Sequence, residues 1–216
     1  AMLAVTIIYW RRLAALALGW RQPQTLIYAG KLATAFLITA VLGLVAKKLG
    51  FALPETLTPV AWALVIGGFW MIGCERLAAR QKNRAEVTWT VAIVVGLAQV
   101  VAGIFPGTSR SAATIFAAML AGTSNRPAAT EFAFLVGIPT MYAASAYELY
   151  AQSKHGAGDE DWTALGIGFV VSAMTAFIAV KWLLGYIQTH RFTVFATYRI
   201  LLGTVLLLMP LLGWIT

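Results

Sequence analysis

The ten residues Phe105-Pro-Gly-Thr-Ser-Arg-Ser-Ala-Ala-Thr114 interrupt a long apolar segment near the middle of the chain. Pro106 and Gly107 end the helix before them, because proline lacks a backbone N–H and glycine readily leaves helical geometry. The hydroxyl side chains that follow are typical of helix N-caps, so a new helix is expected to begin immediately after the break. The stretch therefore predicts two helices joined by a tight polar turn.

The second of these helices is too short to cross a membrane alone. Apolar residues run over 87–105 before the turn and over 111–123 after it. A helix over 111–123 would be roughly 20 Å long, whereas a bilayer core is about 30 Å thick. We therefore expect 87–123 to form a re-entrant hairpin or a broken helix pair, with its turn inside the membrane. Polar backbone at that depth must be buried in protein or line a wet cavity.

The composition of the whole chain agrees with a membrane protein. Of its 216 residues, 60% are hydrophobic and only 11% are charged, and the mean hydropathy is +0.80. Soluble domains contain about 25% charged residues. This excludes a soluble enzyme, a secreted disulfide scaffold and a disordered tail, and the single Cys74 excludes an intrachain disulfide and a cysteine-cluster metal site.

The remaining apolar runs predict an all-α polytopic membrane protein without a domain boundary. Helices are expected over 1–10 with a continuation to about Trp20, and over 31–47, 59–77, 127–149, 163–183 and 193–213. The first residues have no basic n-region and no cleavage site, so they do not resemble a signal peptide. We interpret them as the tail of a helix whose beginning is missing.

Basic residues in the loops predict the topology. One basic cluster precedes the 31–47 span and another follows the 59–77 span, which places both clusters in the cytoplasm by the positive-inside rule. These residues are Arg11, Arg12 and Arg21, then Arg76, Arg80, Lys82 and Arg84. If the 87–123 hairpin enters the membrane and returns to the cytoplasmic side, Arg126 and Arg191 are also cytoplasmic. The acidic loop over 151–162 is then outside.

Arg110 is the strongest candidate for a functional residue. It is expected at a helix N-terminus, where free backbone N–H groups and the helix dipole favour an anion, and its guanidinium adds a forked donor. Thr114 falls on the same helix face, and Ser109 and Ser111 flank the arginine. The alternative is a capped turn whose arginine reaches the surface. We favour a phosphate site, because ionisable residues at membrane depth are functional by default.

Other polar residues leave alternatives open. Gln99 is expected either to line a cavity shared with the Arg110 motif or to form a hydrogen bond with a neighbouring helix. Glu131 is expected to contact either Arg110 or a metal ion. Arg199, six residues into the last span, is a candidate for a second phosphate contact. Solvated positions are expected for the remaining polar side chains near span ends and in loops, namely Glu75, Glu148, Lys181, His155 and His190.

Several known catalytic patterns are absent from the sequence. There is no G-x-x-x-x-G-K-[ST] loop, no G-x-S-x-G elbow and no H-E-x-x-H. The acid-phosphatase type of lipid phosphatase also has a Ser-Arg pair, but it requires a histidine and an aspartate where this chain has Phe116 and Leu120.

The chain resembles the undecaprenyl-diphosphate phosphatases linked to bacitracin resistance. The match is carried by Pro106-Gly-Thr-Ser-Arg-Ser-Ala-Ala-Thr114, which is similar to the family pattern P-G-x-S-R-S-x-x-T. Further similar positions are Trp10-Arg11-Arg12, Ala63-Leu-Val-Ile-Gly-Gly68, Glu131-Phe-Ala-Phe-Leu135, Ile138-Pro139 and Tyr198-Arg199. The family pattern begins with a Glu-x-x-x-Glu stretch and P-x-S-S-T-G-H, and this chain contains neither.

The resemblance implies a membrane phosphatase that hydrolyses a polyprenyl diphosphate to the monophosphate and inorganic phosphate. It implies an inverted-repeat helical bundle, with 1–86 as the remainder of the first repeat and 87–216 as the second. Ser109, Arg110 and Thr114 would be catalytic, and Gly107, Ser111, Arg199 and Gln99 would bind substrate. The divalent cation, Mg²⁺ or Ca²⁺, would be held mostly by glutamates outside this chain, with Glu131 as a candidate ligand.

The resemblance also implies a bacterial cytoplasmic membrane, with the active site facing its outer side. The partners would be the polyprenyl lipid and the membrane rather than nucleic acid, because the basic residues behind the net charge of +8 are scattered between apolar runs. A homodimer is left open. The alternative function is a transporter or flippase of polyprenyl phosphate, since inverted repeats with broken helices are typical of secondary transporters.

Because part of the family pattern is missing, we expect these 216 residues alone to be inactive. The measurement is release of inorganic phosphate from a polyprenyl diphosphate by this exact polypeptide in detergent. Release above the uncatalysed background would contradict the expectation.

Overall fold

A computed structural model describes residues 2–50, 57–81, 83–154 and 162–209. Within these residues the chain forms helices and no strand, as predicted for an all-α protein. The helices are α1 (Met2–Ile8), α2 (Trp10–Leu18), α3 (Pro23–Lys48), α4 (Leu57–Ala78), α5 (Trp89–Ile104), α6 (Arg110–Ala121), α7 (Arg126–Lys154), α8 (Trp162–Thr189) and α9 (Thr193–Leu208). Parts of two predicted elements, the 151–162 loop and the end of the 193–213 span, lie outside the described residues.

The main difference from the predicted helices is at the N-terminal end. The predicted span over 31–47 begins earlier, at Pro23, and this proline occupies the first turn of α3, where its missing N–H costs no hydrogen bond. The apolar run over 1–20 divides at Tyr9 into α1 and α2. The prediction rested on hydrophobicity, so it included the apolar part of α3 and missed its polar first turns.

The surface of the helices confirms a polytopic membrane protein. Three of the described helices are long and apolar enough to cross a membrane, over Pro23–Lys48, Leu57–Ala78 and Thr163–Ile187. In the last of these helices, no residue of the most apolar 18-residue stretch is buried inside the protein. Large side chains such as Ile167, Phe169 and Met174 are exposed there. A continuous apolar face of this kind would be a liability in water and suits contact with lipid.

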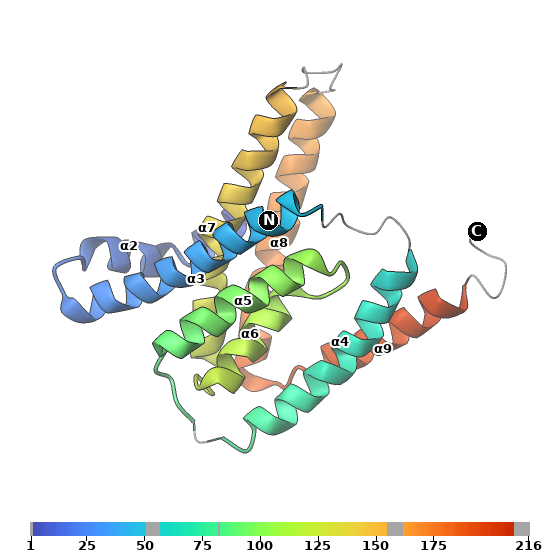
Figure 1. Ribbon diagram of the computed structural model, residues 1–216, viewed down its shortest axis with the longest axis horizontal. Coiled ribbons are helices and arrows are strands. Elements are labelled where there is room, and N and C mark those ends of the chain that lie inside the picture. The colour runs from blue at the N-terminus through green and yellow to red at the C-terminus, as the bar shows by residue number, and fades with distance from the viewer. Residues whose placement is uncertain (1, 51–56, 82, 155–161, 210–216) are drawn as a thin grey trace.

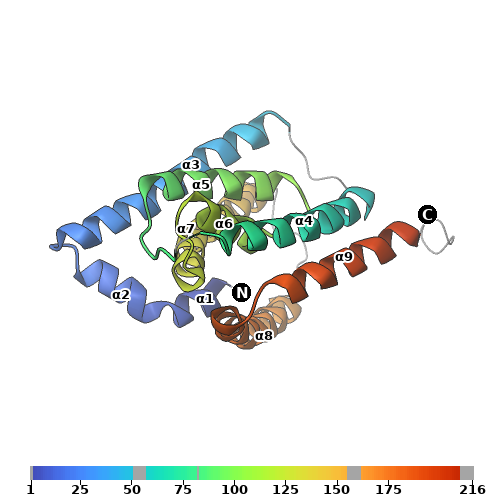
Figure 2. The same cartoon turned by 90° about the horizontal axis from the view of Figure 1, so that it is seen from below.

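Helix α6 lies at the centre of the molecule. It packs against α4, α5 and α7, and its residues from Ala112 to Met119 are all buried. Figures 1 and 2 show α5 beside α3 and α4 beside α9, and Figure 1 shows the α7–α8 pair projecting from the remainder. The hairpin that carries the motif is therefore enclosed by helices from both halves of the chain.

At the open end of the α5–α6 hairpin, opposite its turn, hydrogen bonds link the segment before α5 to the segment after α6. The backbone N–H of Asn125 donates to the carbonyl of Arg84 (2.9 Å), and the hydroxyl of Thr123 donates to the carbonyl of Glu86 (2.8 Å). The two helices have 16 and 12 residues, so they are roughly 24 and 18 Å long. Both are shorter than a bilayer core, and the chain enters and leaves the hairpin at the same end. This is the geometry expected of a re-entrant hairpin.

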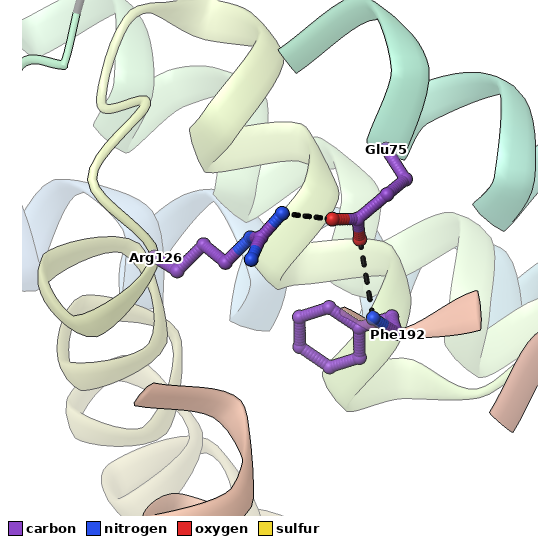
Figure 3. A network of polar contacts seen from close by, with 3 residues as sticks. All are labelled: Glu75, Arg126 and Phe192. Carbon is purple, nitrogen blue, oxygen red and sulfur yellow. Dashed lines mark hydrogen bonds and ion pairs between the residues drawn. The ribbon is translucent and has the colours of Figure 1, made fainter. Parts of the chain in front are cut away.

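Glu75 joins three helices near this end, where a solvated carboxylate was expected. Its residue is only 4% exposed. One carboxylate oxygen pairs with the guanidinium of Arg126 at the start of α7. The other accepts from the backbone N–H of Phe192 (3.3 Å), the residue before α9 (Figure 3). The expectation was wrong because a position near a span end does not reveal the cation on another helix that faces it.

Loss of this carboxylate should destabilise the fold. Glu75→Ala leaves the Arg126 charge and the Phe192 N–H without their acceptor, so the free energy of unfolding should fall by about 3 kcal/mol. The measurement is unfolding of the purified protein in mixed micelles by a denaturing detergent.

The matched control is Glu148→Ala, which removes the exposed Lys47–Glu148 pair (2.8 Å). Exposed pairs contribute little, so this change should be below about 1 kcal/mol. Equal effects of the two substitutions would contradict the structural role of Glu75.

Candidate functional site

The turn between α5 and α6 has the geometry that the motif predicts. Helix α6 begins at Arg110, and the Ser109 hydroxyl caps it by accepting from the backbone N–H of Ala112 (3.3 Å). Gly107 has a φ of +85°, which side-chain-bearing residues rarely adopt. The backbone N–H groups of Arg110 and Ser111 precede the first intrahelical bond, so they are left for other acceptors.

A cavity of about 260 Å³ lies beside this helix start. Its polar lining comes from α5 and α6, and its apolar lining comes from α1, α7 and α8. The polar residues are Gln99, Arg110, Ser111 and Thr114, and the apolar ones are Met2, Val5, Ala133, Phe134, Gly137, Met141 and Val180. The cavity therefore combines cationic and hydroxyl groups with a hydrocarbon wall.

Arg110 has no carboxylate partner in this cavity. The ion pairs within the described residues are Arg12–Glu131, Lys47–Glu148 and Arg126–Glu75. A guanidinium that lies at a helix N-terminus and is not neutralised by an acid attracts anions. This is the arrangement that a phosphate group requires.

Gln99 lines the same cavity, the first of the two alternatives left open by the sequence. Its residue is only 2% exposed, and neither its amide oxygen nor its amide nitrogen has a hydrogen-bond partner among the described residues. Buried polar atoms are normally paired. An amide with both groups unpaired can donate to a ligand oxygen and accept from a ligand hydroxyl or water.

The hydroxyl groups of the motif have different surroundings. Thr114 is buried, and its hydroxyl lies 2.9 Å from the carbonyl of Arg110 and 3.0 Å from that of Ser111, to which it donates. The hydroxyl oxygens of Ser109 and Ser111 are 3.4 Å apart, and Ser111 is the more exposed of these two serines. The catalytic roles of Ser109 and Thr114 remain predictions.

Arg199 lies on α9 and is not among the residues that line the cavity. Its Nη2 donates to the carbonyl of Gly107 at 2.8 Å and to the carbonyl of Ala63 at 3.3 Å. The structure thus brings Arg199 to the motif turn, but through the backbone of the turn. A contact of Arg199 or Gly107 with a phosphate group stays a prediction.

Glu131 pairs with Arg12 and not with Arg110, which was one of the two alternatives left open for it; the other, a metal ion, stays a prediction. The Arg12 Nε donates to the Glu131 carboxylate at 2.7 Å, and both side chains are more than one-third exposed. Sequence reasoning missed this pair because Arg12 is 119 residues away. Across the described ranges, no group of three or more His, Cys, Asp or Glu side chains gathers to hold a metal ion.

A larger cavity lies near Arg12, at the turn between α2 and α3. Its volume is about 380 Å³, and its lining includes Arg12, Gln22 and Thr25. None of the motif residues lines it. We therefore place the candidate site in the smaller cavity, where the residues singled out by the sequence converge.

Comparison with known proteins gives a consistent result over the whole chain. The family model described as bacitracin resistance protein BacA matches residues 1–205. A protein of Rhizobium johnstonii named undecaprenyl-diphosphatase is 69% identical over 216 residues, which cover 100% of this chain and 82% of the relative. A protein of the same name from Xanthomonas euvesicatoria is 57% identical over 209 residues, covering 96% of this chain and 79% of the relative.

The unpaired amide of Gln99 has a consequence for stability. Gln99→Leu replaces two buried, unpartnered polar atoms by methyl groups, so the free energy of unfolding should stay equal or rise. If the amide were bonded to its surroundings, the same substitution would lower the free energy by about 1–3 kcal/mol. Unfolding of the purified variant in mixed micelles distinguishes the two cases.

Proposed function

Because the chain belongs to the bacitracin resistance protein BacA family, we propose that it acts as an undecaprenyl-diphosphate phosphatase. The reaction adds water to the terminal phosphorus of the lipid diphosphate and breaks its bond to the bridging oxygen. The products are the lipid monophosphate, inorganic phosphate and a proton. This recycles the lipid carrier used in cell-wall synthesis.

The observation that carries the proposal is the guanidinium of Arg110, which has no carboxylate partner within the described residues and lies in a cavity with polar and apolar walls. Catalysis of phosphoryl transfer depends mainly on positioning and on neutralising charge. Arg110 would bind the non-bridging oxygens of the diphosphate in a forked geometry. The N–H groups of the first turn of α6, together with Ser111, would bind the remaining oxygens.

The other motif residues complete the proposed site. Ser109 and Thr114 are the proposed catalytic hydroxyls, and Gln99 is the proposed amide contact to the diphosphate or to the attacking water. The apolar side of the cavity, with Met2, Met141 and others, would take the first isoprenoid units of the tail. A soluble phosphate ester would make no apolar contact with that wall, so the cavity favours a lipid substrate.

We further propose that the site faces the outer side of a bacterial cytoplasmic membrane. The open end of the hairpin is associated with basic residues, including Arg84 and Arg126. The positive-inside rule places such an end in the cytoplasm. The turn with Arg110 is at the opposite end of α5 and α6, so it would point outward.

A divalent cation is expected from the family resemblance, but the described residues do not form a ligand set for it. No cluster of acidic or histidine side chains lies among them, and Glu131 already pairs with Arg12. We therefore assign no step of the reaction to a metal ion. Phosphate release with and without a chelator measures the requirement directly.

The proposal predicts that Arg110→Ala, made in the product of the complete gene, lowers kcat/KM at least about a thousandfold. Arg110→Lys keeps the charge without the fork, so it should restore only part of the rate. The measurement is phosphate release from undecaprenyl diphosphate in detergent. The control is Arg80→Ala, which removes an exposed arginine in the turn after α4 and should leave the rate unchanged.

Wild-type hydrolysis by Arg110→Ala would overturn the assignment of the site. The same protein in liposomes tests the transport alternative. Phosphate release without movement of lipid between leaflets supports the enzyme, and lipid movement without phosphate release supports a flippase.

A further inference from the structure

The turn of the hairpin contains a backbone carbonyl that needs a donor. Inside a membrane, a carbonyl without a hydrogen bond costs several kcal/mol. The turn is closed by the N–H of Thr108, which donates to the carbonyl of Phe105 (3.2 Å). The carbonyl of Gly107 is bonded from outside the hairpin, by Nη2 of Arg199 at 2.8 Å. One side chain of α9 thus satisfies the backbone next to the helix cap of α6.

Helix α4 is shaped to admit this guanidinium. A Cβ atom on Gly67 would lie 2.7 Å from the Nη2 of Arg199, so the glycine provides the space. The same Nη2 also lies 3.3 Å from the carbonyl of Ala63 on α4. A Cβ atom on Gly107 would lie 2.7 Å from the carbonyl of Val60. The turn, α4 and α9 are therefore in close contact around Arg199.

The charge of Arg199 has no acid to neutralise it within the described residues, whose ion pairs involve other side chains. Its Nη2 instead lies near two carbonyl oxygens from different elements. The two N–H bonds of this one nitrogen donate to both carbonyls, and the guanidinium stays ionised. The residue is half-buried against the turn and does not line the cavity of Arg110.

We propose that Arg199 is a positioning residue, which holds the carbonyl of Gly107 and thereby fixes the cap of α6 and the guanidinium of Arg110. In this role Arg199 acts through the turn, whereas the sequence predicted a direct contact with phosphate. The positioning role rests on the proposed phosphatase function for its kinetic consequences and on the geometry of the turn for its structural ones.

The kinetic test, made in the product of the complete gene, uses Gly67→Ala, which adds one methyl group against Nη2 and changes no residue of the cavity. The displaced guanidinium weakens its bond to the turn, and kcat should fall about tenfold with KM nearly unchanged. Arg199→Gln should lower kcat about a hundredfold, and Arg199→Lys should restore part of that loss. The matched control is Gly73→Ala on the same helix, where a Cβ atom meets nothing within 4 Å.

A double variant separates the positioning role from general destabilisation. If Gly67 acts only through the guanidinium, Gly67→Ala combined with Arg199→Gln should be no slower than Arg199→Gln alone. Additive losses would overturn the proposal. So would a Gly67→Ala variant as active as Gly73→Ala, or an Arg199→Gln variant with raised KM and unchanged kcat, the signature of a lost substrate contact.

A second readout does not require activity. In a Thr108→Cys background, a membrane-permeant maleimide reports how open the turn is, with buried Cys74 as the low background. Arg199→Gln and Gly67→Ala should raise the labelling rate, and Gly73→Ala should not. An unchanged rate overturns the positioning role even in an active enzyme. If the complete gene product releases no phosphate even without substitutions, a raised labelling rate still supports the positioning role, while the proposed function is overturned.

Discussion

The fold depends on one constraint, which is that backbone polar groups inside a bilayer must find their hydrogen bonds within the protein. Helices meet it by themselves, and the turn at 105–109 is where the chain leaves helical geometry between two apolar helices. Three local solutions occur there: the Ser109 cap, the bond from Thr108 to Phe105, and the guanidinium of Arg199 on the Gly107 carbonyl. The first two come from the motif itself. The third comes from another part of the chain, so the turn is stable only in the folded bundle.

The two sides of the hairpin differ in how tightly they are packed, and this difference determines where the candidate site lies. On the side of α4 and α9, the ring of Phe116 lies between those of Trp70 (5.7 Å between centroids) and Phe192 (5.1 Å), and glycines let backbones approach. Small residues are the usual means by which membrane helices pack closely. On the side of α1, α7 and α8, the packing leaves the cavity that contains Arg110 and Gln99. One side holds the turn rigidly, so the other side can present unpaired groups to a ligand.

The local features of the sequence predicted the hairpin, its capped second helix and the approximate position of each long helix. They did so because helix periodicity, turn residues and caps are properties of neighbouring residues. The missed contacts join residues that are far apart, namely Glu75 to Arg126 over 51 positions and Arg12 to Glu131 over 119. A single sequence states which side chains are charged, but not which helix faces them or which of them become buried. The early start of α3 was missed for a different reason, because its first turns are polar and are held by Pro23.

The pairing of the arginines distinguishes their roles at the hairpin. Arg126 meets a carboxylate, which cancels its charge and leaves a structural link between helices. Arg199 donates from one nitrogen, Nη2, to two carbonyl oxygens, which does not cancel its charge. Its buried Nε has no hydrogen-bond partner among the described residues. Arg110 has no carboxylate partner within the described residues, and it lines a cavity instead. Because charges interact strongly where water is scarce, the uncancelled charge of Arg199 behind the turn adds to the field of Arg110 in front of it. A doubly charged headgroup that enters the cavity would thus experience both cations while touching only one.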